Sequence, residues 1–183
     1  MTVLLLGLLL WVGSHMFKRI APKARASMGD SAKAMVAGLS VLGIVLMVLG
    51  FRAATQVQLY HTPSWGVHVN NLAMVVAIYL LGVSGTKGVL VNKMRHPMLT
   101  GVLVWALAHL LVNGDSVSLV LFGGLGLWAV AEMVLINRAS KWKRPPPGSL
   151  TGDAKNLVAT VLIFGVATGI HIWLGHNPFV AVM

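Results

Sequence analysis

The sequence contains no cysteine and only four acidic residues among its 183 positions. Without cysteine there are no disulfide bonds, thiolate metal sites or cysteine nucleophiles, so His, Asp and Glu remain as metal ligands. Charged residues make up 10% of the chain, whereas 57% of the residues are hydrophobic. A soluble domain of this size would have too few polar residues to cover its surface. We therefore interpret the chain as an integral membrane protein.

The formal net charge of +10 is the second compositional feature. Such a charge can indicate nucleic-acid binding, but the basic residues here lie in short segments between apolar runs. We interpret them as topology signals. The expected partner is the lipid bilayer, and we expect no nucleic-acid partner.

Apolar runs of helical length predict an all-α fold, a polytopic membrane helix bundle of about six transmembrane helices in one domain over residues 1–183. Some runs are shorter than the ~20 residues that cross a hydrocarbon core, so we expect them to continue into flanking residues. Positive charge follows the first run instead of preceding it, which favours a retained helix over a cleaved signal peptide. The predicted spans are Thr2–Phe17, Ser31–Phe51, Trp65–Ser84, Pro97–Val112, Ser116–Ile136 and Asn156–Leu174.

The distribution of Lys and Arg predicts the orientation. Of the 14 basic residues, all except Arg52 lie in or beside the segments that follow the first, third and fifth spans. Basic segments stay on the cytoplasmic side of a membrane. Both termini are therefore predicted to face the periplasm, with the protein in a bacterial inner membrane.

Histidines within the apolar spans are the candidate functional residues. His109 lies among Val, Leu, Ala and Trp, where a titratable group is costly unless it is partnered. Residue depth groups it with His68 and His171 towards the periplasm, and places His15 and His96 towards the cytoplasm. Bundle cores often hold a cofactor between facing helices, and two imidazoles suffice to ligate haem iron. His96 and His109 are roughly 20 Å apart along one helix and cannot share a metal ion.

A second polar group is predicted at the cytoplasmic side. Arg95, His96 and Glu132 are expected to form an inner polar cluster. A carboxylate at this depth most often pairs with a neighbouring cation, here Arg95 or Arg138. An ion pair that joins two helices is the favoured interpretation, and catalysis is the alternative.

The segment Asn113-Gly114-Asp115 ends the helix that Pro97 begins. Asp115 is expected to cap the next helix by accepting hydrogen bonds from its first amides. The alternative role, fixing the tautomer of a nearby ligand histidine, is the less favoured interpretation.

These motifs carry a resemblance to a known family. The pattern resembles the NnrU family of bacterial inner-membrane proteins, which shares its domain with the plant haem-dependent zeta-carotene isomerase. The resemblance covers nearly the whole chain. Its motifs are Arg95-His96-Pro97, Trp105-x-x-Ala108-His109 and Asn113-Gly114-Asp115, preceded by an apolar first helix with His15.

The resemblance implies a haem b cofactor whose iron ligands match His15 and His109, with Trp105 in the same motif. It links the protein to denitrification or nitric oxide metabolism, or to redox-gated cis–trans isomerisation of an apolar small molecule. Because residue depth places His15 and His109 in different layers, His68 is the second choice as partner of His109. The isomerase has a cysteine where this chain has Ala106, so thiolate switching is unavailable here.

Two other functions stay open. Arg95–Gly101 also resembles isoprenylcysteine and phospholipid methyltransferases, but those enzymes continue with paired glutamates and spaced tyrosines. Here Glu132 stands alone, and Tyr60 and Tyr79 precede the motif. The third possibility is a non-enzymatic subunit or assembly factor whose histidines only bridge helices.

Overall fold

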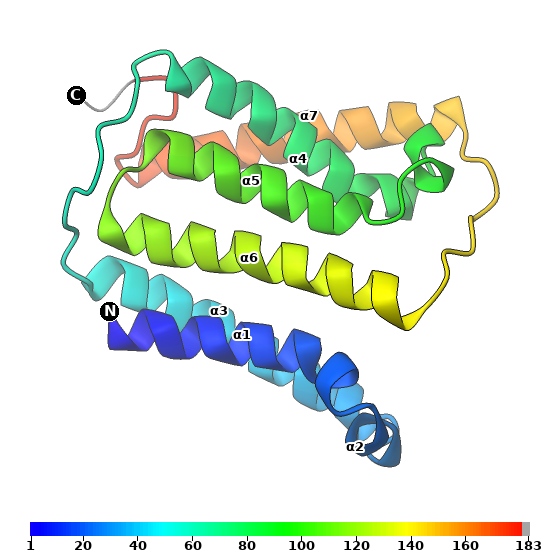
Figure 1. The fold of residues 1–183 in the computed structure, drawn as a ribbon. Coiled ribbons are helices and arrows are strands. Elements are labelled where there is room, and N and C mark those ends of the chain that lie inside the picture. Colours follow the sequence, from blue (N-terminus) through cyan, green and yellow to red (C-terminus); the bar gives the residue numbers. More distant parts are fainter. Residues whose placement is uncertain (181–183) are drawn as a thin grey trace.

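The computed structural model describes residues 1–180, and these residues fold into α-helices joined by short segments (Figure 1). The helices pack into one bundle, as the all-α prediction requires. They are α1 (Thr2–Ile20), α2 (Pro22–Ser27), α3 (Ser31–Ala53), α4 (Gly66–Thr86), the 3-10 helix η1 (Val89–Asn92), α5 (Pro97–Val112), α6 (Ser116–Ala139) and α7 (Leu150–Trp173).

Within residues 1–180, five helices are long and apolar enough to cross a membrane, namely α1, α3, α4, α6 and α7. The sixth predicted span is α5, an apolar helix of 16 residues that is about 24 Å long. The protein is therefore a polytopic helical membrane protein, and each predicted span corresponds to one helix.

The short helix α2 was not predicted, and it forms a corner after α1. Proline disfavours the helical conformation in the residue before it, and Ala21 accordingly has φ −129° and ψ 63°. The chain bends there, and Pro22 begins α2 because its fixed φ suits a first helical turn. The corner carries several of the basic residues that follow the first span.

Helix α6 lies between two groups of helices (Figure 1). On one side it packs against α1 and α3, and on the other against α5, which packs on α4 and through it on α7. An apolar core joins the groups, because Trp11 of α1 and Trp105 of α5 both pack against the buried cluster around Leu125. Apart from that residue, the cluster consists of Leu4, Met47 and Val117.

Small residues bring α1 and α3 into backbone contact. A Cβ atom added at Gly50 would lie 2.2 Å from the backbone nitrogen of Leu4, and one at Gly43 would lie 3.0 Å from the carbonyl oxygen of Gly7. Close approach at such positions is the usual role of small residues in membrane helices. Gly165 and Gly169 of α7 make no such seam, since nothing lies within 4 Å of the positions that their Cβ atoms would take.

The two ends of the bundle differ. We call the end with the segments 21–30, 87–96 and 140–149 the basic end, because these segments contain most of the Lys and Arg residues. The opposite end contains the segments 54–65 and 113–115. These two segments are joined by backbone hydrogen bonds, including one from Leu59 N to Gly114 O at 2.8 Å.

Candidate functional site

Two histidines share a local arrangement. His15 of α1 and His109 of α5 each follow a tryptophan by four residues, and each Nδ1 lies 2.9 Å from that tryptophan's carbonyl oxygen. A carbonyl oxygen can only accept, so Nδ1–H donates and Nε2 is left unprotonated in the neutral ring. The repeated Trp-x-x-x-His spacing is visible in the sequence, but only the second copy was noticed from it.

The imidazole of His15 lies in an aromatic pocket between α1 and α6. It stacks on Trp11 with ring centroids 4.1 Å apart, and it makes a T-shaped contact with Trp128 at a centroid distance of 5.2 Å. The indole Nε1 atoms of both tryptophans are buried and have no hydrogen-bond partner within residues 1–180. A buried donor without an acceptor costs about 1–3 kcal/mol. Two such donors therefore lie on the rings that contact His15.

The imidazole of His109 has a more uniformly apolar environment. It stacks on Phe122 of α6 with centroids 4.5 Å apart, and the ring of Trp105 lies 5.1 Å away. Trp105 and Phe122 also contact each other edge to face at 4.9 Å. The expected proximity of Trp105 to His109 is therefore present.

The two imidazoles are not in contact within the described part of the chain. Their partners on α6, Trp128 and Phe122, are six residues apart, which is about 9 Å along the helix axis. Trp128, which contacts His15, lies nearer the basic end than Phe122, which contacts His109. This is the order in which residue depth places the two histidines. Trp11 and Trp105 nevertheless pack against the same core cluster.

The other two candidates in the outer layer, His68 and His171, are exposed. His68 lies near the start of α4, and His171 lies near the end of α7. Nδ1 of His171 lies 2.7 Å from the carbonyl oxygen of Ala167, so it has the same backbone bond without the aromatic neighbours. In residues 1–180, three or more His, Asp or Glu side chains nowhere gather into a metal-ion site.

The predicted pairing of Glu132 with Arg95 or Arg138 is wrong. Glu132 Oε1 accepts from Nε of Arg19 at 3.0 Å, and the pair links α6 to the end of α1. The physical reason is the position of Glu132 along the helix axis. It lies about two turns before the end of α6, level with Arg19 of α1. The other oxygen, Oε2, is buried without a hydrogen-bond partner among the described residues.

The remaining members of the predicted inner cluster contact the last turn of α6. Arg95 Nη2 donates to the carbonyl oxygens of Ser140 at 2.6 Å and of Ile136 at 3.3 Å. His96 Nε2 lies 2.9 Å from Oδ1 of Asn137. Arg95 thus adds a donor at the end of α6, where Ile136 O also accepts from Ser140 N at 3.2 Å. The predicted cluster is two separate contacts, and Glu132 belongs to neither.

The turn beside His109 is built by the Asn113-Gly114-Asp115 motif. Asn113 Nδ2 donates to the carbonyl oxygen of His109 at 2.8 Å, which closes α5. Asp115 Oδ1 accepts from the amides of Val117 and Ser118, both at 2.9 Å, so the predicted cap of α6 is confirmed. The carboxylate is turned towards the helix amides, whereas Nδ1 of His109 is bonded to a backbone carbonyl.

Tyr60 fastens the neighbouring segment to this turn. Its hydroxyl donates to the carbonyl oxygens of Leu110 and, at 2.9 Å, of Asn113. Burial, followed by the negative charge of Asp115, raises the pKa of Tyr60 above its ordinary value of 10.0. The hydroxyl therefore stays a donor throughout the neutral range.

These features define a class of protein: a membrane helix bundle in which one central helix contacts two tryptophan–histidine pairs from different helices. A family model described as NnrU protein matches residues 3–178. The chain belongs to the NnrU family, as the sequence motifs predicted. No curated protein and no solved structure matches the chain significantly.

Proposed function

We propose that the protein binds haem b in the membrane, with His109 and His15 as the iron ligands. The observation that carries this proposal is that the two imidazoles have the same hydrogen-bonding arrangement. Each has Nδ1 held by a backbone carbonyl 2.9 Å away, and Nε2 of each has no hydrogen-bond partner among residues 1–180. A backbone carbonyl that accepts from Nδ1–H orients a ligating imidazole and raises its basicity.

The residues present fit a haem group in their chemistry. The neutral imidazoles of His15 and His109 would hold the haem iron. The unpartnered indole N–H groups of Trp11 and Trp128 lie on rings that contact His15. Haem b carries carboxylate side chains, which would supply acceptors of the kind these two donors lack.

The chain's own residues would fix the ligands and exclude water. Phe122 and Trp105 cover His109, while Trp11 and Trp128 cover His15. Bound haem would supply a one-electron redox centre whose potential depends on its axial ligands and the low local dielectric. The role in denitrification, nitric oxide metabolism or isomerisation of an apolar molecule follows from the family resemblance and stays a prediction.

The proposal is tested by an absorption spectrum of the purified protein after reconstitution with haem. We expect a Soret band of a six-coordinate, low-spin haem. His109→Ala and His15→Ala should each remove one axial ligand and give a high-spin spectrum or loss of haem.

The control is His96→Ala, because His96 is roughly 20 Å from His109 along the same helix and its Nε2 lies 2.9 Å from Oδ1 of Asn137. It should leave the spectrum unchanged. If His68→Ala gives the high-spin form and His15→Ala does not, the partner of His109 is His68. If the parent protein binds no haem, the proposal fails and the histidines serve to pack helices.

The two indole donors provide a test that does not depend on activity. Trp11→Phe and Trp128→Phe each remove one buried, unpartnered N–H group. Their effect on the haem-free protein should be small, since the loss of ring area is offset by removal of the orphaned donor. The gain in melting temperature that haem gives the parent should be smaller in both variants. An equal gain would show that these donors do not contact the bound group.

The predicted topology is tested separately. We propose that both ends of the chain face the periplasm of a bacterial inner membrane, since the basic end should face the cytoplasm. A reporter that is active only in the cytoplasm should be inactive when it is fused to the C-terminus. Activity of that fusion would show that the orientation is the opposite of the one proposed.

A further inference from the structure

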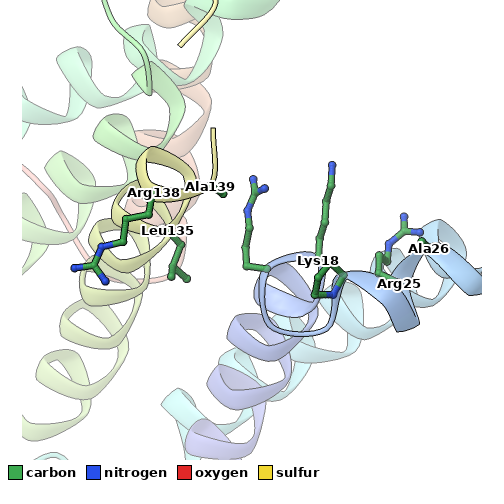
Figure 2. Close-up of a pocket in the computed structure, with 8 residues that line it drawn as sticks. Lys18, Arg25, Ala26, Leu135, Arg138 and Ala139 are labelled. Atoms are coloured by element: carbon green, nitrogen blue, oxygen red, sulfur yellow. The ribbon is translucent and has the colours of Figure 1, made fainter. Parts of the chain in front are cut away.

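At the basic end a cleft of about 680 Å³ separates the α1–α2 corner from the last turns of α6 (Figure 2). One wall is formed by the end of α1 and by α2, and the other by residues 135–139 of α6. The residues that line it are Lys18, Arg19, Pro22, Arg25, Ala26, Leu135, Arg138 and Ala139.

The charge of this cleft is not neutralised within the protein. Four of the eight lining residues are basic and none is acidic. Arg19 uses its Nε in the ion pair with Glu132, and the other ion pair of residues 1–180, Lys33–Asp30, lies outside the cleft. Lys18, Arg25 and Arg138 therefore have no carboxylate partner in the described chain. A cleft lined by one sign of charge attracts counter-ions of the other.

The charged side chains of the two walls extend in different directions. Lys18 and Arg25 extend in the same direction from the α1–α2 corner, while Arg138 leaves the facing wall and extends away from the corner (Figure 2). Between the cations the lining is aliphatic, with Leu135 and Ala139 on one side and Pro22 and Ala26 on the other. A small soluble anion would gain nothing from these apolar groups.

We propose that this cleft binds the phosphate headgroup of an anionic phospholipid. Lys18 and Arg25 hold the phosphate, and the aliphatic lining contacts the upper part of the acyl chains. Basic pockets between membrane helices at the cytoplasmic side commonly recognise such headgroups. This site is independent of the haem proposal, because none of its residues belongs to either tryptophan–histidine pair.

The test uses the purified full-length protein in neutral detergent, with phosphatidylglycerol, phosphatidylcholine or inorganic phosphate as the probe. Bound lipid is counted by native mass spectrometry, and the melting temperature is measured in parallel. Phosphatidylglycerol should be retained and should raise the melting temperature, whereas phosphatidylcholine should do neither. Each basic side chain near a lipid headgroup contributes roughly fivefold in affinity, so Lys18→Gln with Arg25→Gln should weaken binding about 25-fold.

The matched control is Lys23→Gln with Lys141→Gln, which removes the same charge at the same end from residues that do not line the cleft. It should bind phosphatidylglycerol like the parent. Ala139→Trp fills the cleft without changing any charge, and it should also reduce lipid binding. This variant keeps the test valid if the double charge variant does not fold.

Three results would overturn the proposal. Equal retention of phosphatidylcholine would show that the headgroup charge is not recognised. Equal loss of binding in the cleft and control variants would point to general surface charge. Displacement of phosphatidylglycerol by inorganic phosphate, with the same rise in melting temperature, would identify a free-anion site instead of a lipid site.

Discussion

The pockets of His15 and His109 begin from the same local motif and differ in what surrounds it. In both, a tryptophan four residues earlier supplies the carbonyl that holds Nδ1. Around His15, α6 provides Trp128 and, one turn later, the charged Glu132. Around His109, α6 provides only the apolar ring of Phe122.

The difference teaches which properties are local and which depend on the tertiary structure. The orientation and tautomer of each imidazole follow from helix geometry, because residues four apart share one face. The polarity around each ring follows from which part of α6 it meets. The His15 pocket is held in place by an ion pair, whereas the His109 pocket is held by a hydrogen-bonded turn.

Removing the ion pair should have the largest effect. Glu132→Gln leaves Arg19 without its partner, and breaking a buried pair in this way costs about 3–5 kcal/mol. Arg19 keeps 27% of its side-chain surface exposed, so we expect the lower end of that range. Thermal unfolding in detergent measures the loss.

A double variant sharpens this result. Arg19→Leu combined with Glu132→Leu should recover part of the stability, because it leaves no unpaired charge. If the double variant is as unstable as Glu132→Gln, the pair is more than a structural link.

The turn beside His109 should be the next most sensitive point. A Cβ atom at Gly114 would lie 2.0 Å from the carbonyl oxygen of Tyr60, so Gly114→Ala must displace the backbone. Overpacking of this kind costs about 1–3 kcal/mol. The control is Gly13→Ala on α1, where nothing lies within 4 Å and alanine should stabilise the helix slightly. Equal melting temperatures for the two variants would contradict this account.

Loss of the Tyr60 hydroxyl should have the smallest effect. Tyr60→Phe removes its hydrogen bonds to the α5–α6 turn and should cost about 1 kcal/mol. The pKa of Tyr60 is raised by burial and then by Asp115, so the folded protein keeps the proton longer than the unfolded chain. This contribution is complete below pH 10 and is lost as the pH rises through the raised pKa.

The measurement is the melting temperature of both proteins from pH 8 to strongly alkaline pH. The advantage of the parent over Tyr60→Phe should be constant up to about pH 10 and then disappear. An advantage that persists at the highest pH would show that the hydroxyl does not act as a donor.

Local sequence signals predicted the features that depend on neighbouring residues. Pro97 marked the start of α5, and Asp115 was recognised as the cap of α6. The partner of Glu132 could not be predicted in the same way, because it depends on how far α1 and α6 are shifted along each other. Trp11 was missed although its spacing to His15 repeats that of Trp105 to His109, so comparison of the two helices would have found it.

Helix α6 decides how far apart the two histidines lie. Helices α1 and α3 meet at backbone distance, and they reach the rest of the bundle mainly through α6. A substitution on that one interface can change the separation of the imidazoles while leaving both Trp-x-x-x-His motifs intact. The two candidate ligands are thus encoded on α1 and α5, whereas the distance between them depends on how these helices pack against α6.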